Sequence, residues 1–283
     1  MFDKKIIQKN FSRGARRYDE AAVVQREAVK ELCELVVRHK ASGVRRGLIL
    51  DLGSGTSFIA KKLLTYDKWR SEASNLQFAQ QRNKKNSKYL RLTPYDSKIF
   101  ELDLSAEMLQ SWHDRPSNVF PIQGDIENPP FRNHSFDLII SSFSLQWIED
   151  FEKNFSKIFS LLKPSGTFAF CLPTDGSLTE LKSANIFNFN ELPKIKNLKS
   201  ALKKSGFTEI FFAKKIVKQN FQNGLEALKS LKKIGANYSD QQKKIITRTQ
   251  LNHFNKFCLK NFGTTNKNIE ISWSVSYFLL QKS

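Results

Sequence analysis

Two glycines that follow an acidic residue form the first stretch of the chain whose residue types suggest chemistry. The apolar residues 48–50 lead into Asp51, and Gly53, Ser54 and Gly55 come shortly after it. Glycines allow positive φ angles and let a ligand approach the backbone closely. Backbone N–H groups at the start of a helix can face a bound group. The pattern predicts a buried strand, a tight turn and a helix that begins near residue 58. Such a unit either binds a nucleotide or only connects two elements.

Two further carboxylates follow apolar segments at places where a nucleotide could use them. Asp103 lies near the end of a predicted strand over 99–105, and Asp125 follows a short predicted strand over 118–122. A carboxylate at the tip of the second strand can accept hydrogen bonds from both hydroxyls of a ribose. One at the tip of the next strand can accept a hydrogen bond from an adenine amino group. Ser105 is predicted to cap the short helix that contains Met108.

The elements that must position these residues alternate between strands and helices. This order predicts an α/β fold with a Rossmann-like, doubly wound, seven-stranded and mostly parallel sheet. The last two strands are expected to form an antiparallel edge hairpin with helices inserted between them as a lid. Residues 1–40 are expected to form helices, interrupted at Gly14. The predicted strands are 48–52, 99–105, 118–122, 135–140, 167–172, 207–217 and 269–281, and the later helices are 152–162, 198–205, 223–234 and 248–260.

This element order suggests three parts for the chain. Residues 1–40 form an N-terminal helical lid, 41–172 form the ligand-binding core, and 173–283 contribute substrate-side helices and the closing edge strands. The aromatic and basic segment 11–19 fits either a lid or an ordinary amphipathic helix. Residues 66–98 are polar and basic and form an inserted loop, longer than a typical connection of about 2–6 residues. This loop is either solvated or a docking arm for an acidic partner.

Composition excludes several classes of protein. Cys33, Cys171 and Cys258 lie far apart without metal-ligand spacing, and the four histidines form no zinc motif, so we expect no metal. No apolar run approaches the ~18 residues of a membrane span, and the N-terminus lacks a signal-peptide core. We therefore expect a cytoplasmic protein, and we expect it to be a monomer. The net charge of +19 indicates either an acidic partner or a composition that is rich in lysine throughout.

Several motifs together resemble the class I S-adenosylmethionine-dependent methyltransferases. They are the D-x-G-x-G turn at 51–55, D-x-S-x-x-M-L at 103–109, G-D-I-E at 124–127, S-F-D-L-I-I-S-S at 135–142 and L-K-P-x-G-x-F at 162–168. Their order and spacing fit that family once the 66–98 loop is set aside. The resemblance implies S-adenosyl-L-methionine as the cofactor.

A narrower resemblance covers nearly the whole chain. The segments 5–25, 144–147, 176–181, 228–236 and 246–251 are similar to the malonyl-[acyl-carrier protein] O-methyltransferases of biotin synthesis. That family implies methyl transfer to the free carboxylate of malonyl-acyl-carrier protein, giving the methyl ester that primes pimeloyl synthesis. The acyl-carrier protein would be an acidic partner for a basic chain. Departures from the family pattern are Ser54 and Ser57 in the glycine turn and the 66–98 insertion, and their effect on cofactor affinity is left open.

The resemblance also implies roles by position. Tyr18 would be the catalytic residue that closes over cofactor or substrate, with helix packing as its alternative role. Gln146 and Trp147 would line the acyl pocket, although Trp147 could equally belong to the core. A cation must bind the malonyl carboxylate, and the candidates are Arg13, Arg17 and Arg248. The implied cofactor residues are Asp51, Gly53, Gly55, Asp103, Leu104, Met108, Asp125, Ile126, Ser141 and Gln25.

Two alternatives to this function remain at this point. One is another protein of the same fold, such as a quinone methyltransferase or an arginine hydroxylase of complex I assembly, against which the 228–251 motifs argue. The other is a non-catalytic, basic nucleic-acid-binding protein. It would need aromatic and basic side chains together on one face, and the 66–98 loop has few aromatics.

Overall fold

Two helices, α1 (Lys4–Ala21) and α2 (Val23–Arg38), begin the fold. The computed structural model describes residues 3–39, 41, 47–65, 97–184, 189–235, 247–264 and 268–283. Asp3 caps α1 by accepting the backbone N–H groups of Lys5 and Ile6. The expected interruption at Gly14 is wrong, because α1 runs through it. The missing side chain instead allows close packing, since a Cβ there would lie 2.9 Å from the carbonyl oxygen of Lys233.

A single seven-stranded sheet forms the centre of the molecule, in the order β3-β2-β1-β4-β5-β7-β6. All neighbouring strands are parallel except that β7 is antiparallel to both β5 and β6. The strands are β1 (Leu48–Leu52), β2 (Lys98–Asp103), β3 (Val119–Gln123), β4 (Phe136–Ser142), β5 (Leu162–Pro173), β6 (Phe207–Phe221) and β7 (Ile269–Lys282). This topology confirms the predicted Rossmann-like sheet and its antiparallel edge hairpin.

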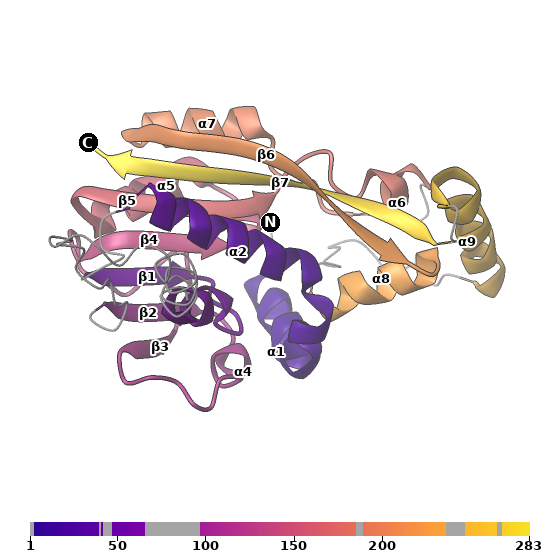
Figure 1. Ribbon diagram of the computed structural model, residues 1–283, viewed down its shortest axis with the longest axis horizontal. Helices are drawn as coiled ribbons and strands as arrows, with labels where there is room; N and C mark the ends of the chain where they lie inside the picture. The colour runs from indigo at the N-terminus through magenta and orange to yellow at the C-terminus, as the bar shows by residue number, and fades with distance from the viewer. Residues whose placement is uncertain are drawn as a thin grey trace, which may run out of the picture.

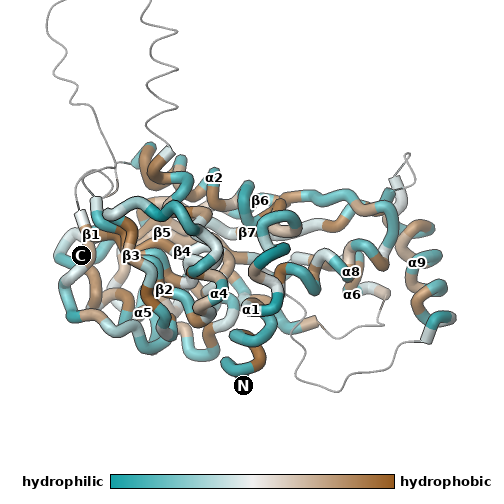
Figure 2. The backbone as a smooth tube through the Cα atoms, turned by 90° about the horizontal axis from the view of Figure 1, so that it is seen from below, coloured by the Kyte–Doolittle hydropathy of each residue, from teal (hydrophilic) through white to brown (hydrophobic). Residues whose placement is uncertain are grey.

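Helices cover both faces of this sheet, as Figure 1 shows. On one face, α2 packs on β4, β5 and β7. On the other, α5 (Phe151–Leu161) and α7 (Ile195–Lys204) pack on β5 and β6. The sheet therefore has a hydrophobic core on each face, and successive strand residues point into opposite cores. Ile49 packs in the core beneath α2, and Leu50 packs in the core beneath α5 and α7. In Figure 2 the centre of the sheet, near β3 and β5, is mostly hydrophobic, as expected where parallel strands are buried on both faces.

The insertion between β6 and β7 contains two helices, α8 (Gly224–Lys233) and α9 (Arg248–Phe262). In Figure 1 they lie at the far end of the long β6–β7 hairpin, close to α6 (Thr179–Ser183). After α8 the chain turns at Gly235, whose φ is +72° and where a Cβ would lie 3.0 Å from the ring of Phe11. Helices α1 and α8 thus pack closely, which joins the N-terminal helix to the insertion between β6 and β7.

Some predictions fall outside this description. Nearly all of the 66–98 loop lies outside the described residues, which resume at Ser97, and so does part of the 228–251 motif region. Within the described residues, no helix combines the length and the apolar character that a membrane crossing requires. The division of the chain into three parts stays a prediction.

Candidate active site

The glycine turn after β1 lies at the carboxyl edge of the sheet, between β2 and the end of β4. Residues 53, 55 and 57 have φ angles of 71°, 55° and 69°, so Ser57 adopts a conformation that favours glycine. Gly53 donates its N–H to the carbonyl of Leu102 at 2.7 Å. A Cβ on Gly53 would lie 2.3 Å from the Cβ of Ser144. The turn therefore needs glycine at position 53 for both its backbone conformation and its packing.

Asp103 fixes this turn from the neighbouring strand. One carboxylate oxygen accepts the N–H of Gly55 at 2.8 Å, and the other accepts the N–H of Ser105 at 2.9 Å. Ser105 in turn caps α4 (Ala106–Leu109), as predicted, by accepting the N–H of Met108. Burial raises the pKa of Asp103 more than these N–H donors lower it. The carboxylate thus joins the turn to α4 while its side chain lines the cavity described below.

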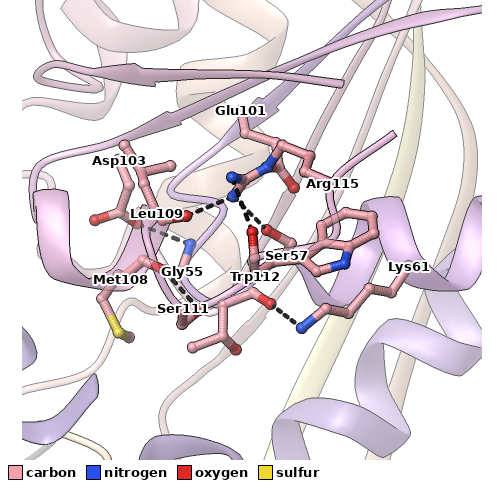
Figure 3. A network of polar contacts seen from close by, with 11 residues as sticks. Gly55, Ser57, Lys61, Glu101, Asp103, Met108, Leu109, Ser111, Trp112 and Arg115 are labelled. Atoms are coloured by element: carbon pink, nitrogen blue, oxygen red, sulfur yellow. Dashed lines mark hydrogen bonds and ion pairs between the residues drawn. The ribbon is translucent and has the colours of Figure 1, made fainter. Parts of the chain in front are cut away.

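A polar network beside the turn connects it to the segment that follows α4 and to Lys61 (Figure 3). Arg115 forms an ion pair with the fully buried Glu101 at 3.0 Å and donates to the Ser57 hydroxyl at 3.4 Å. Its guanidinium and the ammonium of Lys61 both approach the ring of Trp112, at 5.5 and 5.4 Å from the centroid. The hydroxyl of Ser57, which stands where a small glycine is common in the family that the sequence resembles, thus has a partner in this network.

Asp51 is the most unusual side chain of the site. It is completely buried, and neither carboxylate oxygen has a hydrogen-bond partner among the described residues. Burial, followed by the nearby charges of Glu101 and Asp103, raises the pKa of Asp51 well above its ordinary value. A buried carboxylate without a partner is costly unless a ligand pairs with it. The side chain therefore fits a cationic group, such as the amino group of a bound amino acid.

A cavity that is open to solvent lies above the turn. The structure brings most of the predicted cofactor residues to its wall, together with Tyr18 and with Trp147, which was predicted for the acyl pocket. The cofactor residues are Gln25, Asp51, Gly53, Gly55, Asp103, Leu104, Met108, Asp125 and Ile126.

Ser141 is the predicted cofactor residue that does not line this cavity. It is fully buried beneath the glycine turn, where its hydroxyl donates to the carbonyl of Leu52 at 2.8 Å. Ser142 and Ser144 line the cavity in its place. The sequence placed the serine run at the right strand end, but it could not show which serine faces the cavity.

Helix α1 lies across the side of the cavity that Leu104 and Asp125 line. Lys4 pairs with Asp125 at 2.6 Å, and Gln8 donates to the carbonyl of Leu104 at 2.9 Å. The hydroxyls of Ser12 and Ser105 are 3.0 Å apart. Burial alone would lower the pKa of Lys4, but its contacts with Asp125 and Glu127 raise it overall. Sequence analysis missed this contact surface, although a polar stripe at positions 4, 8 and 12 is a signal for it.

A second cavity adjoins the first. Phe11, Tyr18, Gln25, Phe143 and Trp147 line both cavities and so form a shared wall. The second cavity continues past this wall toward β7. Its further lining includes the predicted Gln146, together with Pro173, Leu178, Lys182, Phe189, Asn190, Glu191, Leu192, Ile234 and Trp273.

Tyr18 lies where the two cavities meet. Its side chain is buried, and burial, followed by the charges of Asp103 and Asp19, raises the pKa of its phenol strongly. The hydroxyl therefore stays protonated at neutral pH and can donate a hydrogen bond, but it cannot serve as a general base.

The predicted arginines are not at this site. Arg13 and Arg17 are exposed on α1, and Arg248 is exposed at the start of α9. None of the three lines either cavity. The sequence could not show this, because the charge of a side chain says nothing about the direction in which its helix face points. Among the described residues no cluster of potential metal ligands occurs either.

Comparisons with known proteins agree with this geometry. A methyltransferase-domain family model matches residues 83–170. The malonyl-[acyl-carrier protein] O-methyltransferase of Acetivibrio thermocellus is 30% identical over 87% of this chain and 83% of the relative. The malonyl-[acyl-carrier protein] O-methyltransferase 2 of Ilyobacter polytropus is 26% identical over the full length of both chains.

Solved structures share the fold at lower identity. The YcgJ protein of Bacillus subtilis superposes with a TM-score of 0.54 and 18% identity, covering 89% of this chain and 98% of that protein. An S-adenosylmethionine-dependent methyltransferase of Thermotoga maritima reaches a TM-score of 0.50 at 14% identity, covering 98% and 100%. With the orphaned Asp51 carboxylate and the cavity above the glycine turn, these findings identify the cofactor as S-adenosyl-L-methionine. The chain is an S-adenosylmethionine-dependent methyltransferase and belongs to the malonyl-[acyl-carrier protein] O-methyltransferase family.

Proposed function

We propose that this enzyme methylates the free carboxylate of malonyl-acyl-carrier protein, giving the methyl ester that starts pimeloyl synthesis. The observation that carries the proposal is the second cavity, which adjoins the cofactor cavity through one shared wall. An acyl group bound there would lie next to the methyl donor. The relatives that match nearly the whole chain are named for this reaction.

The cofactor would occupy the first cavity. Asp51 would pair with its amino group, and Gly53 and Gly55 would contact its methionine part through the backbone. Asp103 would bind the ribose hydroxyls with the acceptor capacity left by Gly55 and Ser105. When bound, S-adenosylmethionine supplies a methyl group on a positively charged sulfur, so the leaving group is already activated.

The acceptor needs no deprotonation, because a malonyl carboxylate is already ionised at neutral pH. One carboxylate oxygen forms the new bond to the methyl carbon as the bond from that carbon to sulfur breaks, and no proton moves. The protein's task is then to orient the two groups and exclude water. Phe11, Phe143 and Trp147 would exclude water at the shared wall, and the protonated Tyr18 would donate a hydrogen bond there.

The proposed partner is the acidic acyl-carrier protein. Arg13 and Arg17 are exposed on the outer face of α1, so we reassign them from the active site to this docking interaction. A net charge of +19 would steer an acidic partner toward the enzyme at low salt. The proposal includes a monomeric enzyme and a location in the cytoplasm. The three free cysteines support the location, since a reducing compartment keeps thiols unpaired.

The test is methyl transfer from radiolabelled S-adenosylmethionine to malonyl-acyl-carrier protein. We expect a carrier-bound label that mild alkali releases as methanol, because the product is an ester. Acetyl-acyl-carrier protein, which lacks the free carboxylate, should stay unlabelled. Absence of the ester, in a preparation that binds S-adenosylhomocysteine normally, would refute the proposed substrate.

A further inference from the structure

Among the described residues that line the second cavity, one side chain is cationic. Lys182 of α6 lines the cavity and is half-buried. Within the part of the chain that the structure describes, its ammonium group makes no hydrogen bond and no ion pair within 4.0 Å. Two carboxylates act on it electrostatically, and one of them, Glu191, lines the same cavity. Glu191 and Asp175 are both exposed, so solvent weakens their effect. Lys182 is therefore a cation placed at a cavity wall without a close counter-ion.

Two neutral donors line the same cavity. Trp273 of β7 is 3% exposed, and its indole N–H has no hydrogen-bond partner among the described residues. The side-chain NH₂ group of Asn190 is likewise buried and lacks a partner. Buried polar groups without a partner are uncommon in folded proteins and call for an explanation. Here a ligand would supply the missing acceptors.

These three groups share one chemical requirement, since an ammonium, an indole N–H and an amide NH₂ all donate hydrogen bonds. A carboxylate has two oxygens with about four acceptor sites, and its negative charge would supply the counter-ion that the ammonium of Lys182 lacks here. Burial lowers the pKa of Lys182 in spite of Glu191 and Asp175. This direction is expected of an ammonium that is poorly solvated, and a bound anion would oppose it.

We infer that Lys182, assisted by Asn190 and Trp273, binds the free carboxylate of the acyl substrate in the second cavity. The inference rests on the proposed function, because it assigns the group that distinguishes a malonyl from an acetyl thioester. Lys182 thus takes the place of the three exposed arginines as the residue that supplies the cation. One carboxylate oxygen paired with these donors leaves the other available to attack the methyl group.

The inference is tested with Lys182→Met, Lys182→Arg and the control Lys157→Met. Lys157 is an exposed residue of α5 and lines neither cavity. With malonyl-acyl-carrier protein as substrate, Lys182→Met should lower kcat/KM by about 10- to 100-fold, mainly through KM, since one charge-assisted hydrogen bond is lost. Lys182→Arg should recover part of this loss, and Lys157→Met should match the wild type. Calorimetry with S-adenosylhomocysteine should give the same affinity in all four proteins.

A binding measurement separates this inference from the proposed function. The complex of the enzyme with S-adenosylhomocysteine should bind malonyl-acyl-carrier protein more tightly than acetyl-acyl-carrier protein, and Lys182→Met should remove the difference. If the wild type makes the ester while Lys182→Met keeps both its KM and its preference, the inference is wrong. If the wild type makes no ester but shows a preference that depends on Lys182, the inference stands and the proposed reaction is wrong. Asn190→Ala should reduce the same preference to a smaller degree, and an unchanged value would remove Asn190 from the site.

Discussion

The two cavities share a wall but differ in charge and origin. Asp51 and Asp103 give the first cavity its acidic character, and both lie at the ends of parallel strands that are fixed by backbone hydrogen bonds. The second cavity has Lys182, the exposed Glu191 and buried N–H donors in its lining, and its walls include parts of α1, α6, β7 and the segment near Asn190. A cationic methyl donor and an anionic acceptor would thus each meet a complementary wall.

This difference indicates which cavity determines cofactor affinity and which determines the choice of acyl substrate. The cofactor cavity is built from the common sheet, so many methyltransferases of this fold can share it. The second cavity depends on elements added to that sheet. Substitutions in the first cavity should therefore change cofactor affinity, whereas substitutions in the second should change the response to the acyl substrate.

The largest effect is expected from Gly53→Ala. A Cβ there would lie 2.3 Å from the Cβ of Ser144, and φ is positive, so we expect a loss of about 3 kcal/mol in the free energy of unfolding and no measurable cofactor binding. Gly55→Ala is the matched control, because its Cβ would meet only the Met108 methyl at 3.7 Å. It should cost about 1 kcal/mol. Denaturant unfolding measures both, and equal losses would show that packing against Ser144 has no role.

Asp51→Asn should separate binding from stability. Affinity for S-adenosylhomocysteine, measured by calorimetry, should fall by about 10- to 100-fold because the ligand's amino group loses its counter-ion. The folded state binds the Asp51 proton more tightly than the unfolded chain does, since burial raises the pKa above the ordinary 3.8. The stability of the ligand-free wild type should therefore fall as the pH rises from about 3.8 through the raised pKa.

The pH dependence of stability in Asp51→Asn is the control for the titration of Asp51. Asp51→Asn removes the titrating group and should flatten this part of the thermal-unfolding profile, so the variant should be more stable than the wild type at neutral pH without ligand. Unchanged affinity would instead limit Asp51 to orienting the turn.

Tyr18→Phe tests the wall that the two cavities share. The variant should keep its fold and its affinity for S-adenosylhomocysteine, because the ring still packs on Phe11 and Phe58. Turnover should fall by about tenfold through loss of one hydrogen bond in the reacting complex. The decrease should be the same across neutral pH, since the phenol stays protonated there. Full activity in a single-turnover assay would assign Tyr18 to packing alone.

The smallest effect is expected at the outer surface. Charge reversal of Arg13 and Arg17 together should raise KM for the carrier protein by about two- to fivefold at low salt and have little effect at high salt. Cofactor affinity should not change. A loss of kcat that persists at high salt would indicate that these arginines act in the active site and not in docking.

The sheet and the cofactor cavity were predictable because their signals are local. A strand followed by a glycine turn, and a carboxylate at each strand tip, identify Asp51 and Asp103 without knowledge of the tertiary structure. The same signals place strand ends within a few residues, although β5 begins at Leu162 instead of residue 167. There the chain turns within the strand, where the pairing with β4 shifts register.

The second cavity was not predictable in this way, because it joins segments far apart in the chain. Trp273 has the pattern of a buried strand residue, and Lys182 that of a surface lysine on a short helix. Only the packing of α6 against β7 brings them to one wall. The prediction that Gly14 interrupts the first helix was wrong for a related reason. Glycine at this position allows a close contact with α8, which no local sequence pattern encodes.

The position of β7 has a consequence for the order in which the molecule forms. This strand pairs with β5 and β6, and its partner β5 ends about a hundred residues earlier in the chain. During synthesis the ribosome must therefore release residues 269–282 before the sheet is continuous, and contacts between such distant segments form slowly. Until then β5 has an open edge, where a chaperone could bind. The strands beneath the first cavity can thus pair while translation continues, but the second cavity gains Trp273 only after β7 has been made.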